Sequence, residues 1–208
     1  MITGLYAITP DEQNTDVLVA KAEAALQGGI KMLQYRNKLA NHKLQTQQAR
    51  ALLALCRQYH VPLIINDSIT LCLTLDADGV HLGADDGNLS EARAKLGADK
   101  IMGASCYNRF DLAVLAQQAG ADYVAFGACF ASSTKPNAAV AGLDLFTRAQ
   151  SELTIPSVAI GGITLENASS VISAGTNAIA VINAIFSPNF TLDDVKLTTQ
   201  QFTQLFTS

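Results

Sequence analysis

The chain has few charged residues and no excess of positive charge. Charged residues make up 15% of its 208 residues, against roughly 25% in an average globular domain. The formal net charge is -4. Nucleic-acid-binding surfaces are usually basic, so this balance argues against nucleic acid as a partner. Hydrophobic residues make up 49% of the chain, which predicts that much of it is buried.

The sequence also lacks the segments that direct a protein to or across a membrane. It has no uninterrupted apolar run of the roughly 18 residues that a membrane span needs. Residues 1–11 contain no basic stretch of the kind that begins a signal peptide. We therefore expect a soluble, cytoplasmic protein with no membrane partner.

Paired cysteine motifs are absent as well. None of the four cysteines forms a C-x-x-C pair, and Cys56 and Cys72 lie in apolar helical patterns. A reduced thiol in such a pattern behaves as a small hydrophobic side chain. We predict buried, reduced cysteines rather than disulfides, redox centres or metal ligands.

Short β-rich runs alternate with amphipathic stretches along the whole chain. The eight predicted strands are Gly4–Thr9, Met32–Arg36, Pro62–Asp67, Gly79–Gly83, Ile101–Cys106, Tyr123–Ala128, Ser157–Gly162 and Ala178–Asn183. Open doubly wound sheets more often have five or six strands, so eight units favour a closed barrel. The sequence predicts an α/β protein with a single (β/α)8 TIM-barrel catalytic domain over residues 1–208.

The intervening helices are predicted from apolar residues at i, i+3 and i+4 spacing, as in residues 18–26 and 44–59. Ser90 is a plausible N-cap. Glycines in position to end helices in the left-handed conformation are Gly28, Gly97, Gly120 and Gly175.

Chemistry in such a barrel occurs at the carboxyl ends of the strands, where polar residues are dense here. Gln34 and Arg36 alternate along the second strand and Lys38 follows. Inward-facing side chains at this spacing would form an anion clamp, because guanidinium gives paired donors and ammonium a point charge. Alternatively, Arg36 points outward and pairs with a helix.

Acidic residues follow the third and fourth strands. Asp67 and Asp86 could share a hard cation, and Mg²⁺ fits better than Zn²⁺ because no Cys/His set converges. Either Asp could instead cap a helix. We expect His81 to be a hydrogen-bonded core residue rather than a ligand.

The ends of the last four strands also carry polar or small residues. Ser105 could orient a substrate or simply bond to backbone, and residues 132–135 could bind an anion or form a flexible polar loop. Gly162 and Asn183 follow strands seven and eight, the usual barrel phosphate site, where a short helix could open. We expect two anion sites, one for a monophosphate and a larger one for a diphosphate with Mg²⁺.

These motifs, in this order, resemble those of the thiamine-phosphate synthase family over almost the whole chain. The residues that carry the resemblance are Gln34-Tyr35-Arg36-Asn37-Lys38, Asn66-Asp67, Gly79-Val80-His81-Leu82-Gly83 with Asp85-Asp86, Gly120-Ala121-Asp122-Tyr123, Ser132-Ser133-Thr134-Lys135 and Ala159-Ile160-Gly161-Gly162-Ile163.

The resemblance implies a reaction and a role for each site residue. The family joins 4-amino-2-methyl-5-(hydroxymethyl)pyrimidine diphosphate to a thiazole phosphate and releases diphosphate, by a dissociative substitution. Residues implied to hold the pyrimidine diphosphate are Gln34, Tyr35, Arg36, Asn37, Lys38, Asn66, Ser105 and Lys135, of which Arg36, Lys38, Ser105 and Lys135 are the catalytic set. Residues implied to hold the thiazole phosphate are Ser132, Ser133, Thr134, Gly162, Ile182 and Asn183. Asp67 and Asp86 would bind Mg²⁺.

The sequence departs from the usual family pattern at Ser68, Tyr107, Ala131-Ser132 and Asn183. These departures leave open a non-catalytic protein that binds thiamine intermediates. A second enzyme alternative is a thiazole-phosphate tautomerase built on a related barrel. A lyase or epimerase that acts on a sugar phosphate is a further alternative. The tautomerase would have no use for the diphosphate clamp.

Overall fold

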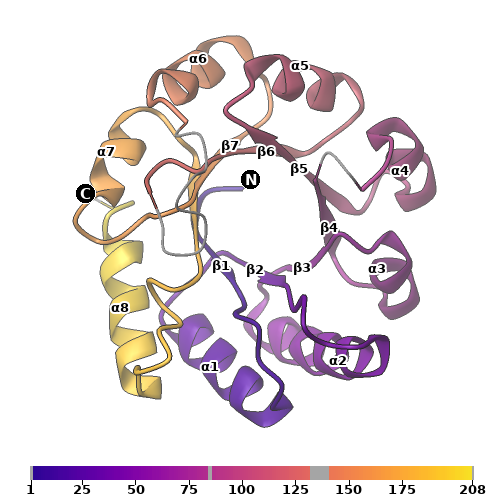
Figure 1. The fold of residues 1–208 in the computed structure, drawn as a ribbon, viewed down its shortest axis with the longest axis vertical. Helices are drawn as coiled ribbons and strands as arrows, with labels where there is room; N and C mark the ends of the chain where they lie inside the picture. The colour runs from indigo at the N-terminus through magenta and orange to yellow at the C-terminus, as the bar shows by residue number, and fades with distance from the viewer. Residues whose placement is uncertain (1, 84–85, 132–140, 208) are drawn as a thin grey trace.

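The computed structural model describes residues 2–83, 86–131 and 141–207. Eight parallel strands form a closed barrel in chain order, with helices outside it (Figure 1). The strands are β1 Gly4–Ile8, β2 Met32–Tyr35, β3 Leu63–Asn66, β4 Gly79–Leu82, β5 Ile101–Tyr107, β6 Tyr123–Phe126, β7 Ser157–Ile160 and β8 Ala178–Val181. This confirms the predicted (β/α)8 barrel.

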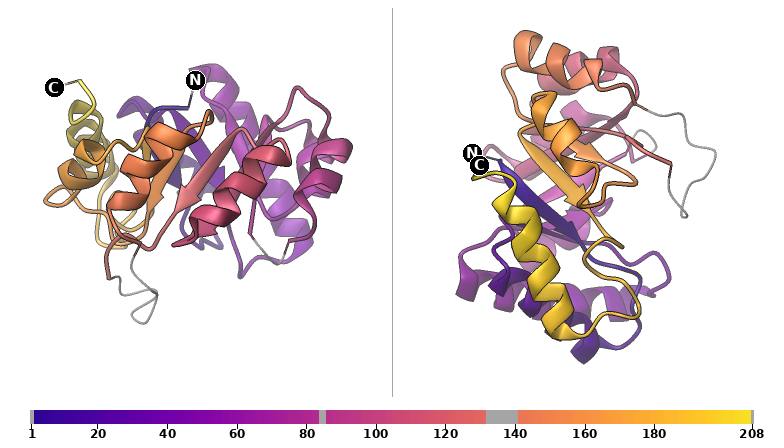
Figure 2. Two further views of the ribbon diagram at one scale, coloured as in Figure 1. Left: turned by 90° about the horizontal axis from the view of Figure 1, so that it is seen from above. Right: turned by 90° about the vertical axis from the view of Figure 1, so that its left-hand side faces the viewer.

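A helix follows each strand. The helices are α1 Thr15–Gln27, α2 His42–Tyr59, α3 Ile69–Leu75, α4 Leu89–Leu96, α5 Phe110–Gln118, α6 Asp144–Glu152, α7 Ala168–Ser173 and α8 Leu192–Gln204. In the side views of Figure 2 the strands slant across the molecule and the helices pack outside them. None of the helices in the described ranges is long and apolar enough to cross a bilayer.

Except for β5, the strands end one or two residues before the predicted ends. The excess residues begin the loops at the carboxyl end of the barrel, which we call the barrel mouth. Asp67, for example, leaves β3 with a φ of 61°, a left-handed conformation that cannot continue a strand. Arg36, Asp67 and Asn183, which the sequence placed at strand ends, therefore lie in loops. Asn66 and Ser105 lie within β3 and β5.

The predicted helix ends are partly correct. Gly97, Gly120 and Gly175 have the expected positive φ values of 77°, 87° and 101°. Gly28 was the wrong glycine, because it continues the helical turn at φ -75° and Gly29 makes the reversal at φ 95°.

The N-cap prediction at Ser90 was also wrong. The cap of α4 is Asn88, whose side chain accepts the amide hydrogens of Ser90 and Glu91. The two positions lie two residues apart, and only Asn88 precedes the first helical residue, where an N-cap side chain can reach the free amides.

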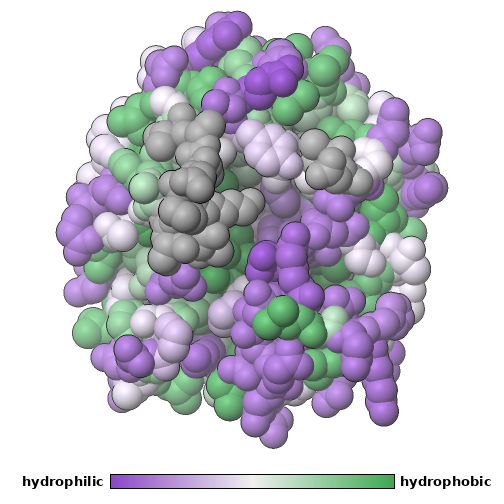
Figure 3. All heavy atoms as spheres, in the orientation of Figure 1, coloured by the Kyte–Doolittle hydropathy of each residue, from purple (hydrophilic) through white to green (hydrophobic). Residues whose placement is uncertain are grey.

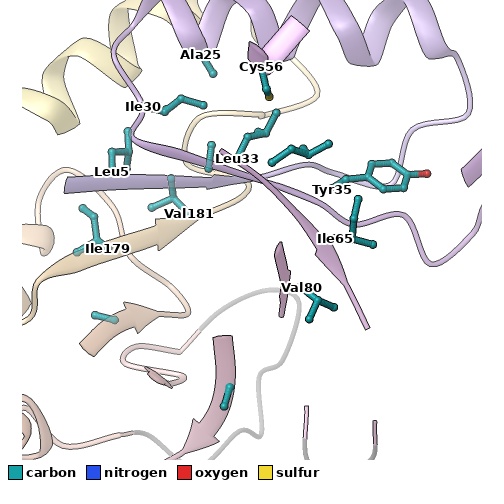
Figure 4. Close-up of a cluster of buried hydrophobic side chains, with 14 of the residues drawn as sticks. Leu5, Ala25, Ile30, Leu33, Tyr35, Cys56, Ile65, Val80, Ile179 and Val181 are labelled. Atoms are coloured by element: carbon teal, nitrogen blue, oxygen red, sulfur yellow. The ribbon is translucent and has the colours of Figure 1, made fainter. Parts of the chain in front are cut away.

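The core has two layers. Inside the barrel Tyr6, Ile8, Met32, Ile64 and Tyr123 pack with small residues of β6 to β8. Between barrel and helices lies a larger layer in which Ala25 and Cys56 of the helices face Leu5 and Leu33 of the strands (Figure 4). All four cysteines are buried and unpaired, as predicted.

Candidate active site

Polar side chains gather at the barrel mouth. In Figure 3, drawn in the orientation of Figure 1, hydrophilic side chains gather at the centre and extend over the region of β2 and β3. A cavity of about 780 Å³ lies there, lined by the ends of β2 and β3 and by residues of α2, α3 and α4. Arg36, Lys38, Asn66 and Asp67 are among its lining residues.

Both cations after β2 are held at the mouth by Asp11, from the loop that follows β1. The Arg36 guanidinium lies 3.3 Å from the Asp11 carboxylate, and the Lys38 backbone N–H donates to the same carboxylate at 2.7 Å. Thr9 fixes the Arg36 backbone by hydrogen bonds to its N–H and its C=O. The alternative, an outward Arg36 paired with a helix, is wrong, because its partner lies in the β1–α1 loop.

Tyr35 and Asn37, the neighbours of these cations, are used by the fold. The Tyr35 side chain lies in the outer layer, where its hydroxyl donates to Gln48 of α2. Asn37 is buried, donates to Gln48 and to the backbone C=O of Glu12, and accepts the amide hydrogens of Leu39 and Ala40. These contacts hold the β2–α2 loop in place and leave Arg36 and Lys38 at the cavity.

The Asp67 and Asp86 carboxyl groups meet at the mouth, joined by a side-chain hydrogen bond. Burial and the charge of Asp86 raise the pKa of Asp67, while Lys38, whose ammonium lies 3.8 Å away, lowers it in part. Asp86 also accepts the Gly83 amide hydrogen at 2.6 Å. Two carboxyl groups in contact need a shared proton or a cation between them, and Mg²⁺ is commonly held by one or two carboxylates. The donor set therefore fits Mg²⁺.

Neither Asp67 nor Asp86 caps a helix. Ser68 caps α3 by accepting the Leu71 amide hydrogen, and Asn88 caps α4. The capping alternative for both aspartates is therefore wrong, and their carboxyl groups stay at the mouth. Arg36, Lys38, Asp67 and Asp86 together are called the rim cluster below.

Inside the barrel, five polar side chains form one hydrogen-bonded row, called the central chain below. Gln34 Nε2 donates to Tyr6 Oη at 2.7 Å, and Tyr6 Oη lies 2.9 Å from Tyr123 Oη. Tyr123 Oη lies 3.0 Å from His81 Nδ1, and His81 Nε2 lies 2.9 Å from Ser105 Oγ. The row runs from β2 to β5 through the middle of the barrel.

The central chain bears on two predictions from the sequence. His81 is a hydrogen-bonded core residue, as expected, and burial lowers its pKa to about 4. Within the described residues, the hydrogen bond of Ser105 Oγ is to the His81 side chain, and its role toward a substrate stays a prediction. Sequence reasoning missed Tyr6 and Tyr123, although both occupy inward positions of a predicted strand. The hydroxyl of a tyrosine buried inside a barrel needs a hydrogen-bond partner. Inward-facing tyrosines on predicted strands could therefore have indicated a polar network in the interior.

The ends of β7 and β8 form the second predicted site. Gly161 and Gly162 have φ values of 99° and 65°, and a Cβ on Gly162 would lie 2.6 Å from the Phe130 carbonyl oxygen. The glycine pair thus lets the loop that follows β6 pack closely against the end of β7. Within the described residues, no hydrogen bond reaches the amide N–H groups of Gly162 and Ile163, so both can serve an anion.

After β8 the chain makes a single turn instead of the expected short helix. The Ile182 carbonyl oxygen accepts the amide hydrogens of Ile185 and Phe186, and Asn183 is exposed on this turn. The predicted residues Ser132, Ser133, Thr134 and Lys135 lie outside the described part of the chain. The structure therefore brings together the rim cluster and Asn66, and separately places Gly162, Ile182 and Asn183 at the ends of β7 and β8.

The chain is similar to known proteins over most of its length. Residues 5–185 match the family described as thiamine monophosphate synthase. The thiamine-phosphate synthase of Methylobacillus flagellatus is 58% identical, over 99% of this chain and 96% of its own length. That of Nitrosospira multiformis is 51% identical, over 99% and 86%. The solved thiamine phosphate pyrophosphorylase from Pyrococcus furiosus superposes with a TM-score of 0.86 at 32% identity, over 98% of this chain and 95% of its own.

Proposed function

Since the chain belongs to the thiamine monophosphate synthase family and is a transferase, we propose which group it transfers. It takes the 4-amino-2-methylpyrimidin-5-ylmethyl group from its diphosphate to 4-methyl-5-(2-phosphooxyethyl)thiazole, with Mg²⁺. The products are thiamine phosphate and diphosphate. The rim cluster carries this proposal, because two cations beside two touching carboxyl groups are more than one phosphate monoester needs.

In this proposal the rim cluster binds the leaving group. Arg36 offers paired N–H donors to diphosphate oxygens, and Lys38 offers a point charge next to Asp67. Asp67 and Asp86 would hold Mg²⁺, which when bound neutralises charge on the departing diphosphate. Asp11 keeps the Arg36 guanidinium at the cavity edge before substrate arrives. A tautomerase would not need this set.

Bond breaking to diphosphate precedes attack by the thiazole nitrogen in this scheme. The electron-rich aminopyrimidine stabilises the methylene cation, so the protein supplies leaving-group electrostatics and alignment. Two observations support it. Burial raises the pKa of every cysteine thiol, to between about 11 and about 12. With its pKa at about 4, His81 is a weak base near neutral pH.

The second substrate would bind at the ends of β7 and β8. The Gly162 and Ile163 amides can donate to its phosphate, with Asn183 on the neighbouring turn. The implied partners Ser132, Ser133 and Thr134, together with Lys135 for the diphosphate, remain predictions from the resemblance.

Incubation of the purified protein with both substrates and Mg²⁺ tests the proposal. We expect equal amounts of thiamine phosphate and diphosphate. Failure to release diphosphate while the thiazole phosphate is isomerised would support the tautomerase, and binding without any turnover would support the non-catalytic protein. Either result would overturn the proposal.

The metal site has its own test. Asp67→Asn is the suitable variant, because Asn tolerates the left-handed backbone at this position better than Ala. Mg²⁺ should raise the melting temperature of the wild type, since a ligand that binds only the folded state stabilises it. The variant should lose this rise and at least about 10-fold in Mg²⁺ affinity. An equal Mg²⁺-dependent rise in both proteins would remove Asp67 from the metal site.

A further inference from the structure

The central chain allows its hydrogen atoms to be assigned one after another. Gln34 presents its amide Nε2 to Tyr6, so Tyr6 Oη accepts at this end. Each phenol has one hydrogen to donate. In the described part of the molecule, the only other polar partner of Tyr6 Oη is Tyr123 Oη. Because Tyr6 is almost fully buried and a buried donor without an acceptor is costly, Tyr6 donates to Tyr123.

The same count fixes the next link. Tyr123 Oη receives the Tyr6 hydrogen and must place its own on a different acceptor. His81 Nδ1, at 3.0 Å, is that acceptor. A nitrogen that accepts carries no hydrogen, so neutral His81 bears its hydrogen on Nε2. His81 Nε2–H then donates to Ser105 Oγ at 2.9 Å.

Ser105 is therefore an acceptor toward the core and a donor toward the mouth. Its Oγ takes the His81 hydrogen, and within the described part of the chain no protein acceptor lies in place for its own hydroxyl hydrogen. Ser105 is also the one member of the chain that is not buried. The β5–β6 register shifts between Ser105 and Tyr107, and such an irregularity re-aims side chains at a barrel rim.

This polarity is opposite to that of a Ser–His nucleophile. In a hydrolase triad the histidine nitrogen facing serine is bare and removes the serine hydrogen. Here that nitrogen bears a hydrogen, so the pair holds a donor in place rather than generating an alkoxide.

We propose that Tyr123 and His81 are positioning residues that hold Ser105 as a hydrogen-bond donor to a ring nitrogen of the aminopyrimidine substrate. An aminopyrimidine offers acceptors at its ring nitrogens and donors at its amino group, so a fixed donor selects the ring nitrogen. The identity of the ligand rests on the proposed function, whereas the donor polarity of Ser105 rests on the central chain alone.

The polarity can be measured without any ligand. In the ¹⁵N NMR spectrum of the substrate-free protein, we expect His81 Nε2 to carry the hydrogen and Nδ1 to be bare and hydrogen-bonded. His81→Gln assigns the signals. A hydrogen on Nδ1 would reverse the chain and overturn the proposal. This measurement is independent of whether the protein turns over the proposed substrates.

A double-mutant cycle tests whether Tyr123 acts through Ser105. Tyr123→Phe and Ser105→Ala should each weaken binding of the pyrimidine diphosphate about 5- to 10-fold, the worth of one hydrogen bond. Because both remove the same interaction, the double variant should bind no more weakly than Ser105→Ala. Affinity for the thiazole phosphate should not change. Additive losses would reduce Tyr123 to a structural role and overturn the proposal.

Tyr59→Phe is the matched control, because the Tyr59 hydroxyl bonds to Glu23 at 3.2 Å outside the barrel. Titration calorimetry with Mg²⁺ present and thiazole phosphate absent measures each affinity.

Two pyridine analogues, each with one ring nitrogen replaced by CH, then identify the contact. Wild type should bind one of them about 5- to 10-fold more weakly than the natural ring, and Ser105→Ala should bind both equally. If the natural diphosphate fails to bind wild type, the proposed function fails while the NMR result still stands.

Discussion

At the residue scale, Asp67 shows how the backbone sets the surroundings of a carboxyl group. Its left-handed backbone ends β3 and turns the side chain toward Asp86. Burial and the second carboxyl group then raise its pKa. Lys38 alone offsets only part of this effect, which is consistent with the proposal that a cation binds between the two groups.

Two residues at the mouth should distinguish the two anion sites. Asn183→Asp places a carboxylate beside the proposed monophosphate, and we expect a loss of roughly 2 to 4 kcal/mol, or about 30- to 800-fold, in thiazole phosphate binding. Arg36→Ala should instead weaken the pyrimidine diphosphate and slow its departure. Calorimetry of each variant with each ligand measures both effects, and equal losses for both ligands in both variants would contradict the assignment.

At the scale of the element, β5 and β6 are built around the Tyr123 ring. Gly103 of β5 pairs with Tyr123 of β6, and a Cβ on Gly103 would lie 2.1 Å from that ring. The ring also makes an edge contact with Tyr6 and stacks on His81. A glycine inside a strand is here explained by the close approach of a neighbouring side chain.

Gly103→Ala should therefore destabilise the protein and misplace Ser105. Overpacking of a buried site costs about 1 to 3 kcal/mol, and the displaced ring would pull His81 away from Ser105. Urea denaturation measures the loss. Gly87→Ala is the control, since nothing lies within 4 Å of a Cβ at Gly87, although its positive φ of 106° adds strain of its own. A Gly103→Ala variant as stable as wild type would show that the Tyr123 ring moves freely.

At the scale of the whole molecule, one buried imidazole links folding to pH. His81 faces Tyr123, Ser105 and the charge of Asp86, and burial lowers its pKa from 6.5 to about 4. The unfolded chain takes up a proton below pH 6.5 and the folded chain only near pH 4. The stability that His81 contributes is therefore present above pH 6.5 and is lost as pH falls to about 4.

Lowering the pKa of His81 from 6.5 to about 4 corresponds to about 3 kcal/mol of unfolding free energy. The contribution of His81 can be measured by urea denaturation of wild type and His81→Gln at pH 7 and pH 4.5. The comparison isolates this contribution because the carboxylates titrate in both proteins. Wild type should lose more stability than the variant over this interval. Equal losses would mean that His81 titrates alike in the folded and unfolded chains.

The sequence by itself determined the barrel, because each strand and each helix has a characteristic spacing of hydrophobic residues along the chain. The runs that end near Arg36, Asp67 and Asn183 were recognisable from neighbouring residues alone. Once eight parallel strands are expected, the residues that follow them must collect at one end. The rim cluster was predictable for that reason, and the inward orientation of Gln34 is one of the two that strand alternation allowed.

Only the tertiary structure decided which of these side chains touch. Tyr6 and Tyr123 are 117 residues apart in sequence, and their contact depends on how the strands are staggered around the closed barrel. Asp11 meets Arg36 because two loops fold over the same mouth. Such contacts are set by register and closure, which no local pattern records. The sequence therefore determined where the polar residues gather, and the closed barrel determined that Ser105 has a hydrogen to donate.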